Sequence, residues 1–451
     1  MVSTQSSPVV SLQAPKDVSI EEIEAELRSL WTSVEEAAAS RAATFTLVVY
    51  EPDGTQQLLA ALGFYTGPID GIAGPRNEAA ITAAQKAYDM EVTGTSSPEL
   101  LNRLQTEYAK AKAEDQLPNE NSTSSMQYSA DSQGAIADAI AAANPCRIIA
   151  LVPSLGQDEG VKAQVSAYCP VNKKSKDTLI CCEYITLSGT AEALERIGGV
   201  INELTIVDLP TFLWWKATPG GDHPLFKRLV SYCDNTIIDS SSFNDPESDL
   251  DCVGKIIEQG VTLADLNWRR LAPWQELSAE AFDPPERRAE IYEVDKVTID
   301  YQKGNQTQAL MFLGWLASRL NWTPVFYDKE GGDYDIRRVK FVSDRDQQEI
   351  EAELAAIPTA DFQKVPGDLI SLRLSSTNLD ADCCTVLCSS TTGCMRMEAG
   401  GGAQSCYIQQ VAPLFDQNTE ELLGQQLQRW GREVLYEESM VVTAKILDLN
   451  H

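Results

Sequence analysis

The stretch Thr55-Gln-Gln-Leu-Leu-Ala-Ala-Leu-Gly-Phe-Tyr-Thr-Gly-Pro-Ile-Asp-Gly-Ile-Ala-Gly-Pro75 determines a compact local fold, because it joins a short apolar helix to a series of glycine turns. Gly63, Gly71 and Gly74 follow a helix end or lie in turns, where we expect the positive φ angles that glycine adopts most easily. Asp70 can close its turn by bonding its own backbone. These residues determine a fold, and they say less about an activity.

The apolar spacing in and after that stretch predicts three amphipathic helices, at residues 56–62, 77–88 and 98–108. We therefore expect a three-helix module over residues 54–106. Residues 107–133 are rich in Ala, Lys, Asn and Ser and contain few apolar side chains, so they are expected to form a linker.

The module interrupts an alternating pattern of helices and strands. Residues 17–50 predict a first helix and a buried strand, and the pattern resumes over residues 134–260. Strands separated by helices favour a largely parallel sheet that is covered on both faces. We therefore predict an α/β N-terminal domain with an inserted three-helix module.

The rest of the chain, residues 261–451, has several candidate strands in succession between two long helices, at 306–320 and 419–435. This order predicts an α+β C-terminal domain with an antiparallel or mixed sheet. Residues 1–16 are rich in Ser, Gln and Pro, and we expect them to be disordered.

The charge of the chain limits its partners. It has 36 Lys and Arg against 66 Asp and Glu, which leaves a formal net charge of −30. Such a chain is not expected to bind nucleic acid, because phosphates require a basic footprint, nor an anionic membrane surface. No segment approaches the ~18 apolar residues of a membrane span, and the N-terminus lacks a secretory pattern. We therefore expect a cytoplasmic protein, whose thiols are normally reduced.

Catalytic motifs are absent from the sequence. It contains no phosphate-binding glycine loop, no His-Glu-x-x-His and no Gly-x-Ser-x-Gly. His223 is the one internal histidine. Because Pro224 follows it, we expect His223 to lie in a loop or to cap a helix rather than to act in catalysis. We predict no catalytic residue, no cofactor and no metal. A sugar-phosphate enzyme on the α/β region would need a polar cleft, which a sequence does not display.

The glycine turns carry a first resemblance. The pattern of Leu58, Gly63-Phe64-Tyr65, Asp70-Gly71 and Gly74-Pro75 resembles the peptidoglycan-binding-type three-helix module over residues 54–106. Asn77 departs from that pattern, in which Thr is common. The resemblance leaves two functions open: glycan binding, which would make the chain a cell-wall protein, or a docking or spacer module. The absence of an export signal favours the second.

A second resemblance spans nearly the whole chain. The segments Asn144-Pro-Cys-Arg-Ile-Ile-Ala150, Asp265-Leu-Asn-Trp-Arg-Arg-Leu-Ala-Pro-Trp274 and Phe312-Leu-Gly-Trp-Leu-Ala-Ser-Arg-Leu320 are similar to the OpcA family of glucose-6-phosphate dehydrogenase assembly proteins. The inserted module resembles the cyanobacterial type. The resemblance implies a non-catalytic subunit that binds the dehydrogenase and favours its active oligomeric state, and so tunes the oxidative pentose phosphate pathway.

Candidate partner-binding residues follow from side-chain type. Trp268, Arg269, Arg270 and Trp274 lie in one proline-bounded segment, and Trp and Arg are enriched at interface hot spots. An interior role for the same side chains is equally compatible with the sequence. Trp215 is a further candidate, since alternation along its strand would expose one of two adjacent tryptophans.

Five of the eleven cysteines fall within residues 383–406. The five small polar residues between Cys388 and Cys394 predict a hairpin, whose flanks bring facing Cβ atoms to about 4.5–5.5 Å, near the separation of a disulfide. We therefore predict a redox disulfide. A metal or iron–sulfur site that adds Cys384 and Cys406, and buried reduced thiols, remain alternatives. The resemblance to the cyanobacterial type implies thioredoxin as reductant, with oxidation strengthening the binding of the dehydrogenase.

Overall fold

The computed structural model describes residues 9–35, 39–40, 43–52, 54–113, 140, 146–170, 179–180, 182–220, 222–358, 365, 367–378, 380–381, 383–390, 394–399, 408–413 and 419–449. The chain divides into two compact units. The first comprises residues 1–238, 261–264 and 419–431, and the second comprises residues 239–260, 265–418 and 432–451. The division at residue 239 lies before the boundary at 260–261 that the sequence predicted.

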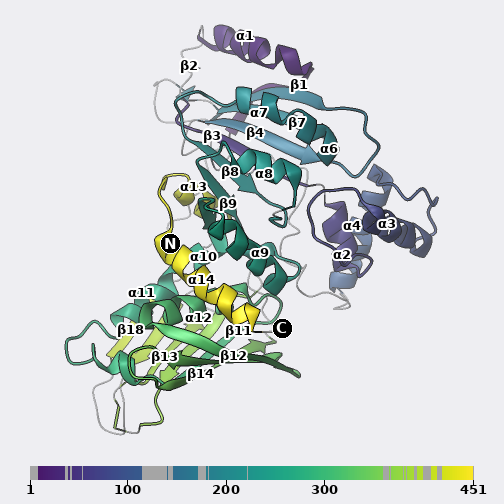
Figure 1. The fold of residues 1–451 in the computed structure, drawn as a ribbon. Coiled ribbons are helices and arrows are strands. Elements are labelled where there is room, and N and C mark those ends of the chain that lie inside the picture. Colours follow the sequence, from purple (N-terminus) through teal and green to yellow (C-terminus); the bar gives the residue numbers. More distant parts are fainter. Residues whose placement is uncertain are drawn as a thin grey trace. The chain divides into compact units, whose positions relative to one another are not determined.

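An eight-stranded sheet forms the centre of the first unit (Figure 1). Its strands, in spatial order, are β1 (Val9–Val18), β5 (Lys162–Pro170), β7 (Cys182–Gly189), β4 (Arg147–Pro153), β3 (Thr46–Tyr50), β8 (Thr211–Trp215), β9 (Asn235–Ile238) and β10 (Leu263–Asp265). β7, β4, β3, β8 and β9 run parallel, whereas β5 is antiparallel to both β7 and β1. The sheet is thus largely parallel, as predicted, with an antiparallel edge.

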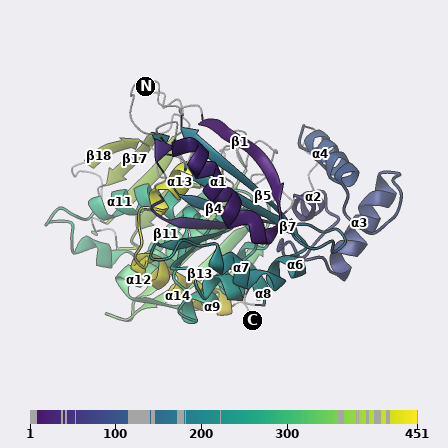
Figure 2. The ribbon, with the colours of Figure 1, turned by 90° about the horizontal axis from the view of Figure 1, so that it is seen from above.

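Continuous apolar runs explain the central strands of this sheet. All five residues of β3 are buried, and so are most of those in β4, as expected where both faces of a parallel sheet are covered. α1 (Ile23–Glu35) packs against β5 (Figure 2), and α6 (Ala191–Arg196) packs against β7 and β4. The remaining elements of this region are α7 (Gly198–Glu203), α8 (Pro224–Val230) and the short pair of β2 (Ala39–Ser40) and β6 (Leu179–Ile180). α13 (Thr419–Gln426) also belongs to the first unit.

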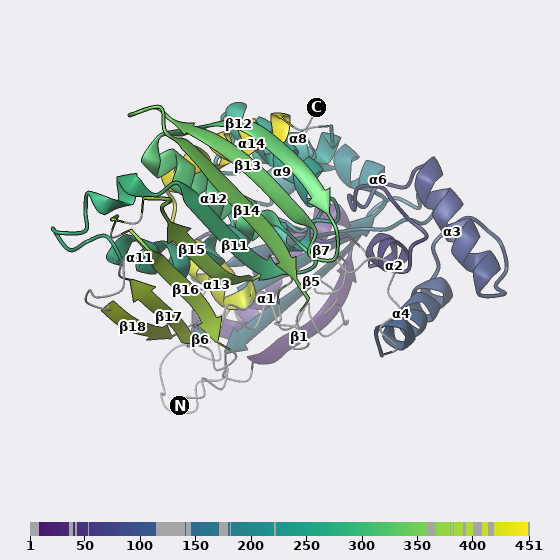
Figure 3. The same ribbon diagram turned by 90° about the horizontal axis from the view of Figure 1, so that it is seen from below.

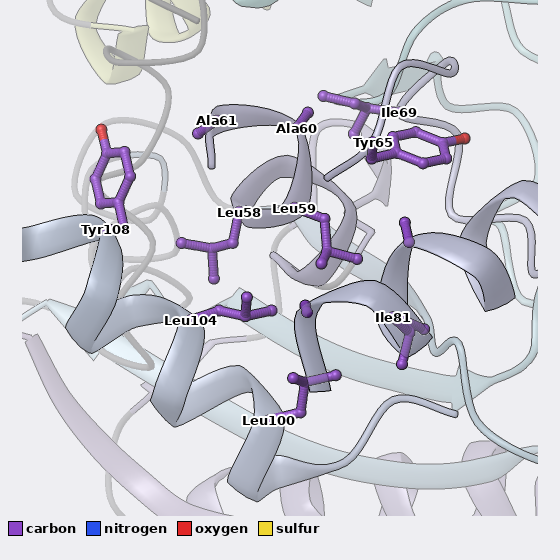
Figure 4. Close-up of a cluster of buried hydrophobic side chains, with 12 residues drawn as sticks. Leu58, Leu59, Ala60, Ala61, Tyr65, Ile69, Ile81, Leu100, Leu104 and Tyr108 are labelled. Carbon is purple, nitrogen blue, oxygen red and sulfur yellow. The ribbon is translucent and has the colours of Figure 1, made fainter. Parts of the chain in front are cut away.

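The three predicted helices of the module are α2 (Thr55–Ala61), α3 (Pro75–Ala87) and α4 (Pro98–Ala113). Their apolar faces share one core, shown in Figure 4, which consists of Leu58, Leu59, Ala60, Ala61, Tyr65, Ile69, Ala80, Ile81, Ala84, Leu100, Leu104 and Tyr108. Gly63 and Gly71 have the predicted positive φ angles, 80° and 76°. The same prediction is wrong for Gly74, which is extended at −144°. Asp70 closes its turn as predicted, since Ile72 N donates to Asp70 Oδ1 at 3.0 Å.

Two predictions at the ends of segments need correction. Residues 1–16 were expected to be disordered, but Val9–Val18 form β1 and pair with β5, so the described part of that range belongs to the sheet. The linker predicted at 107–133 begins later, because α4 continues to Ala113. The rest of that linker lies outside the described residues.

A second eight-stranded sheet forms the centre of the other unit. Its strands, in spatial order, are β12 (Trp322–Gly331), β13 (Ile336–Ser343), β14 (Glu349–Ile357), β11 (Lys296–Gln302), β15 (Leu369–Ser375), β16 (Thr385–Ser390), β17 (Cys394–Ala399) and β18 (Ile408–Pro413). β11 and β14 are parallel, and the other neighbours are antiparallel. The sheet is therefore mixed, as the α+β pattern predicted.

Helices cover one face of this second sheet. They include α9 (Pro246–Glu258), α10 (Leu266–Arg270), α11 (Ala272–Glu280), α12 (Thr307–Leu320) and α14 (Val434–Asp448). α12 packs against α14 and β11, and its apolar residues are almost all buried. Along β14, Ile350 and Ala352 are buried, whereas Glu349 and Glu351 are exposed. Figure 3 views the second sheet from below, with its strands in front of the helices. The single helix predicted at 419–435 is wrong, since α13 and α14 are separate helices.

Candidate partner-binding and redox sites

The segment that begins at Asp265 is held by its own side chains. Asp265 caps α10, because its Oδ1 accepts hydrogen bonds from the backbone N–H groups of Asn267 (2.8 Å) and Ser240 (3.0 Å). Asn267 Nδ2 then donates to Thr307 Oγ1 at 2.8 Å. The Asp-Leu-Asn pattern therefore ties three distant stretches of the second unit together.

Arg270 forms a bidentate ion pair with Asp239. Its guanidinium group donates to both oxygens of Asp239, with nitrogen–oxygen distances of 2.7 and 2.9 Å, and also to Asn267 Oδ1 at 3.3 Å. Only 1% of the Arg270 side chain is exposed. A bidentate pair of this kind fixes the geometry of both partners. The Arg270 side chain therefore binds residues in the interior of its own chain.

Two further carboxyl groups lie near this pair. Gln308 Nε2 donates to Asp368 Oδ1 at 2.7 Å and to Asn267 Oδ1 at 2.9 Å, so Asp368 joins the same network as Asp265. Burial raises the pKa of Asp265 to about 6 and that of Asp368 to about 6, and the charge of Asp239 adds to both shifts. Burial would also raise the pKa of Asp239, but the charge and hydrogen bonds of Arg270 outweigh it and lower that pKa. The network therefore holds acidic groups of unequal strength.

The other members of the predicted contact segment are also engaged internally. Trp268 is 5% exposed, with its ring centroid 5.5 Å from that of Tyr436, and Trp274 is 2% exposed. Arg269 Nη2 lies 2.9 Å from a carboxylate oxygen of Glu433. The low exposure of these side chains argues against the partner contact suggested for them. It favours the interior role, which the sequence left open.

Trp215 departs from the alternation argument as well. Trp214 and Trp215 are both buried, because neither face of β8 is open to solvent, and the expectation that one would be exposed is wrong. The Trp215 ring stacks on Tyr50 of the neighbouring strand, with centroids 3.8 Å apart and planes 7° apart. His223 lies beside them and caps α8 by accepting a hydrogen bond from Phe226 N at 3.3 Å, as the capping interpretation predicted.

The predicted redox pair lies on the two strands of one hairpin. Cys388 is in β16 and pairs with Arg396 of β17, whereas Cys394 is in β17 and pairs with Ser390. The two cysteines therefore occupy diagonal positions on one face, with the pair Ser389–Met395 between their own pairs, rather than facing positions. Diagonal neighbours are about 7–8 Å apart, with their Cβ atoms somewhat closer, whereas a disulfide requires a Cβ separation of about 3.5–4.5 Å.

The remaining thiols of the described residues differ in accessibility. Cys383 is 1% exposed, and burial raises its pKa to about 11, whereas the adjacent Cys384 is half-buried. In the first unit, the Sγ atoms of Cys146, which directly precedes β4, and Cys182, the first residue of β7, lie 3.7 Å apart. Within the described residues, no group of three or more His, Cys, Asp or Glu could hold a metal ion. Cys406, part of the metal alternative, lies outside those residues.

Across the described ranges, none of the helices combines the length and apolar character needed to cross a bilayer.

Comparison with known proteins identifies the family. Residues 137–255 and 261–440 match the profiles of the "Glucose-6-phosphate dehydrogenase subunit N-terminal domain" and "C-terminal domain" of OpcA. A Synechocystis protein named "Putative OxPP cycle protein OpcA" is 58% identical over 455 residues, covering 100% of this chain and 96% of the relative. The chain belongs to the OpcA family. A Nostoc punctiforme protein of the same name is 59% identical, covering 99% of this chain and 97% of the relative.

The other matches are narrower or weaker. Residues 55–104 of this OpcA family member match a "Putative peptidoglycan binding domain". Among solved structures, the 3-ketoreductase KijD10 of Actinomadura kijaniata has a TM-score of 0.37 at 9% identity, covering 58% of this chain and 81% of that chain. Gal80p of Kluyveromyces lactis has a TM-score of 0.37 at 7% identity, covering 58% and 77%. Scores of this size establish no common fold.

Two clusters of residues in this chain could not be identified from any pattern in the sequence. Asp239 and Asp368 complete the network around Arg270, but they lie in different stretches, and a chain with 66 acidic residues singles out neither. Cys146 and Cys182 come together only because β4 pairs with β7 in a register that places Arg147 opposite Glu183. Only the tertiary structure brings the members of each cluster together.

Proposed function

We propose that this chain is a non-catalytic, redox-responsive subunit that binds glucose-6-phosphate dehydrogenase and favours its active oligomeric state. The observation that carries the proposal is the family match, which covers both described units and is accompanied by relatives named for the OxPP cycle. Activation then arises because the chain binds the active conformation more tightly than the inactive one. The size of the effect is bounded by that difference in affinity.

The hydrogen bonds among the buried polar side chains of the second unit support a structural rather than a catalytic role for these side chains. The Arg270–Asp239 pair, Asn267 and Gln308 bond to one another inside the second unit. Groups so engaged are costly to separate, because each would be left buried without its partner. They stabilise the shape that a partner would recognise.

We further propose that Cys388 and Cys394 form the redox element. On oxidation the two thiols lose two protons and two electrons to a disulfide oxidant, and thioredoxin, a dithiol, reverses the reaction by exchange. Because the two positions are diagonal in the β16–β17 ladder, bond formation requires their Cβ atoms to approach by about 2–3 Å. The strands must shift to allow it. A hairpin with two arrangements is an element that a partner can sense.

The test uses the full-length chain and the dehydrogenase from the same organism. Oxidised chain should comigrate with the dehydrogenase on size exclusion and lower its KM for glucose 6-phosphate, and reduction by thioredoxin should weaken both effects. Cys388→Ser should remove the difference between oxidised and reduced chain. Cys384→Ser, which alters a half-buried thiol of the same cluster, is the matched control. If the chain fails to comigrate with the dehydrogenase in both redox states, the assembly role is overturned, whereas a Cys388→Ser chain that still responds to oxidation overturns only the redox element.

A second function rests on the match of residues 55–104 to a peptidoglycan-binding domain. A chain that works through this module would bind glycan. Sedimentation with purified peptidoglycan separates the two functions, since an assembly subunit should remain in the supernatant.

A further inference from the structure

The sheet of the first unit has a topological switch point between β3 and β8. Along the chain, β3 is followed by β4 and β7 on one side, and the chain then returns to β8 and β9 on the other side. In open α/β sheets, ligands bind beyond the carboxyl ends of the strands at such a point. Here those ends are Tyr50 and Trp215, which are partners in the strand register.

Aromatic side chains line this edge. The Tyr50 and Trp215 rings stack, and the His223 ring stands edge-on to both, with centroid distances of 5.4 and 4.8 Å. Tyr50 and Trp215 are fully buried, and His223 is 5% exposed. A surface of this kind would suit a flat or polar ligand, but something already covers it.

The cover is the turn at residues 68–72 of the helical module. Tyr50 Oη donates to the backbone oxygen of Asp70 at 2.7 Å, and His223 Nε2 lies 3.3 Å from the same oxygen. Thr218 N donates to Ile69 O at 2.8 Å, and Ile69 N donates to Thr218 Oγ1 at 3.3 Å. The α/β domain thus bonds the turn through backbone and side-chain groups, as it would bond a ligand.

The module prepares the turn for this contact. Gln56 of α2 accepts a hydrogen bond from Gly71 N at 2.7 Å, and its amide donates to Asp70 Oδ1 and to the backbone oxygen of Ile72, both at 3.2 Å. The turn is therefore held in shape by one helix of the module while its outer edge faces the α/β domain. Such preorganisation lowers the entropic cost of docking.

Gly71 shows how close the contact is. Its φ of +76° disfavours other residues, and an added Cβ would lie 2.8 Å from both Pro153 Cγ and Tyr50 Oη, which belong to the α/β domain. Gly94 of the module also has a positive φ, +70°, but the atoms nearest to an added Cβ would belong to Glu78 and Thr82 of α3. A substitution at Gly71 therefore disturbs the contact with the α/β domain, whereas the same substitution at Gly94 disturbs the module itself.

From these contacts we infer that the Asp70-Gly71 turn is an internal ligand of the α/β domain: it occupies the switch-point edge, fixes the helical module there and closes that edge to dinucleotides. The signature turn of the module then serves docking within the chain. This inference is independent of the proposed partner, since every residue that carries it lies in the first unit.

Hydrogen exchange of the full-length chain tests the docking. In Gly71→Val, the amide of Thr218 should exchange on the order of tenfold faster or more, because its bond to Ile69 opens, while amides in α3 and α4 stay protected. Gly94→Val should leave Thr218 unchanged. If Gly71→Val unfolds the module, a second variant, Tyr50→Phe, tests the docking, because Tyr50 lies in the α/β domain and not in the module. Tyr50→Phe should speed amide exchange in the turn at residues 68–72 alone. Unchanged protection of both the turn and Thr218 in Tyr50→Phe overturns the inference.

A binding measurement tests the closure. NAD⁺ is the probe, and tryptophan fluorescence is the readout. Wild-type chain should show no saturable quenching by NAD⁺, because the turn already fills the edge. Saturable quenching in the wild type that disappears in Trp215→Phe would show an open edge and overturn the inference.

Discussion

The guanidinium group of Arg270 forms two hydrogen bonds to the carboxylate of Asp239, 31 residues earlier in the chain, at 2.7 and 2.9 Å. Only 1% of the Arg270 side chain and 14% of the Asp239 side chain are exposed, so each group has lost most of its contact with water and depends on the other for its charge balance. The pair therefore anchors the Asp265–Trp274 segment to the start of the second unit.

Replacing Arg270 should test this anchor. In Arg270→Met the carboxylate of Asp239 loses its cation while only 14% of its side chain is exposed, and we expect the free energy of unfolding to fall by about 3 kcal/mol. Urea denaturation followed by circular dichroism measures the loss. Arg338→Gln is the matched control, since it removes an exposed Arg that pairs with Glu330 and Glu353, and should barely move the midpoint. Equal effects of the two substitutions would contradict the anchoring role.

The buried carboxyl groups predict an unusual pH dependence. Asp265 and Asp368 have a pKa raised to about 6 in the folded chain, against about 3.9 when unfolded, so the folded chain binds more protons between these values. Their contribution to stability is complete below about pH 4 and is lost as the pH rises through about 6. We therefore expect these groups to make the second unit more resistant to urea at pH 5 than at pH 7.5.

Asp368→Asn isolates one of the two groups. Asparagine still offers an oxygen to Gln308, but it does not ionise. The variant should gain stability at pH 7.5, on the order of 1–2 kcal/mol, and lose part of the difference between pH 5 and pH 7.5. An unchanged pH profile would show that Asp368 does not titrate in this range.

The fold was predictable where local preference and pairing agree. The apolar runs of β3, β4 and β8 indicated buried strands, and the glycine turns indicated the module. The sequence of β14, Glu349–Ile357, gives no strand signal, because it is rich in Glu, Ala and Leu, which favour helices. Its pairing with β11 and β13 overrides that preference.

The candidate sites were less predictable, for a related reason. The types of Trp268 and Arg270 suit an interface and a core equally, and the choice depends on Asp239 and Tyr436, which only the fold brings near. The Cys388–Cys394 spacing correctly indicated a hairpin. The register within that hairpin, which makes the two positions diagonal, depends on the turn and could not be obtained from spacing.

Thiol labelling should separate the neighbours Cys383 and Cys384. Burial raises the pKa of Cys383 to about 11, so very little of it is thiolate at pH 7.5, and the side chain is 1% exposed. Iodoacetamide should therefore modify Cys384 at least about tenfold faster than Cys383 in the folded chain. Peptide mass spectrometry reads both rates from one sample, and the difference should vanish in urea. Equal rates in the folded chain would contradict the burial of Cys383.

The contact surface for the proposed partner should lie on accessible residues rather than on the buried tryptophans. A bulge in the edge strand β12 turns two consecutive apolar side chains outward: Val325 is 50% exposed and Phe326 is 43% exposed. Exposed apolar side chains on an edge strand are suited to a protein partner. We therefore expect Phe326→Ser to weaken binding of glucose-6-phosphate dehydrogenase by about tenfold or more, as loss of an interface hot spot would.

Tyr292→Ser provides the matched control for that variant. Tyr292 is an aromatic residue of similar exposure, 46%, in the same unit, but its ring is covered by Arg345, whose guanidinium carbon lies 4.1 Å from the ring centroid. Biolayer interferometry with immobilised dehydrogenase should show weaker binding for Phe326→Ser alone, while both variants keep the wild-type unfolding midpoint, because neither side chain is buried. If Phe326→Ser binds like the wild type, the partner contacts a different surface, and the bulge in β12 serves only to protect the sheet edge from self-association.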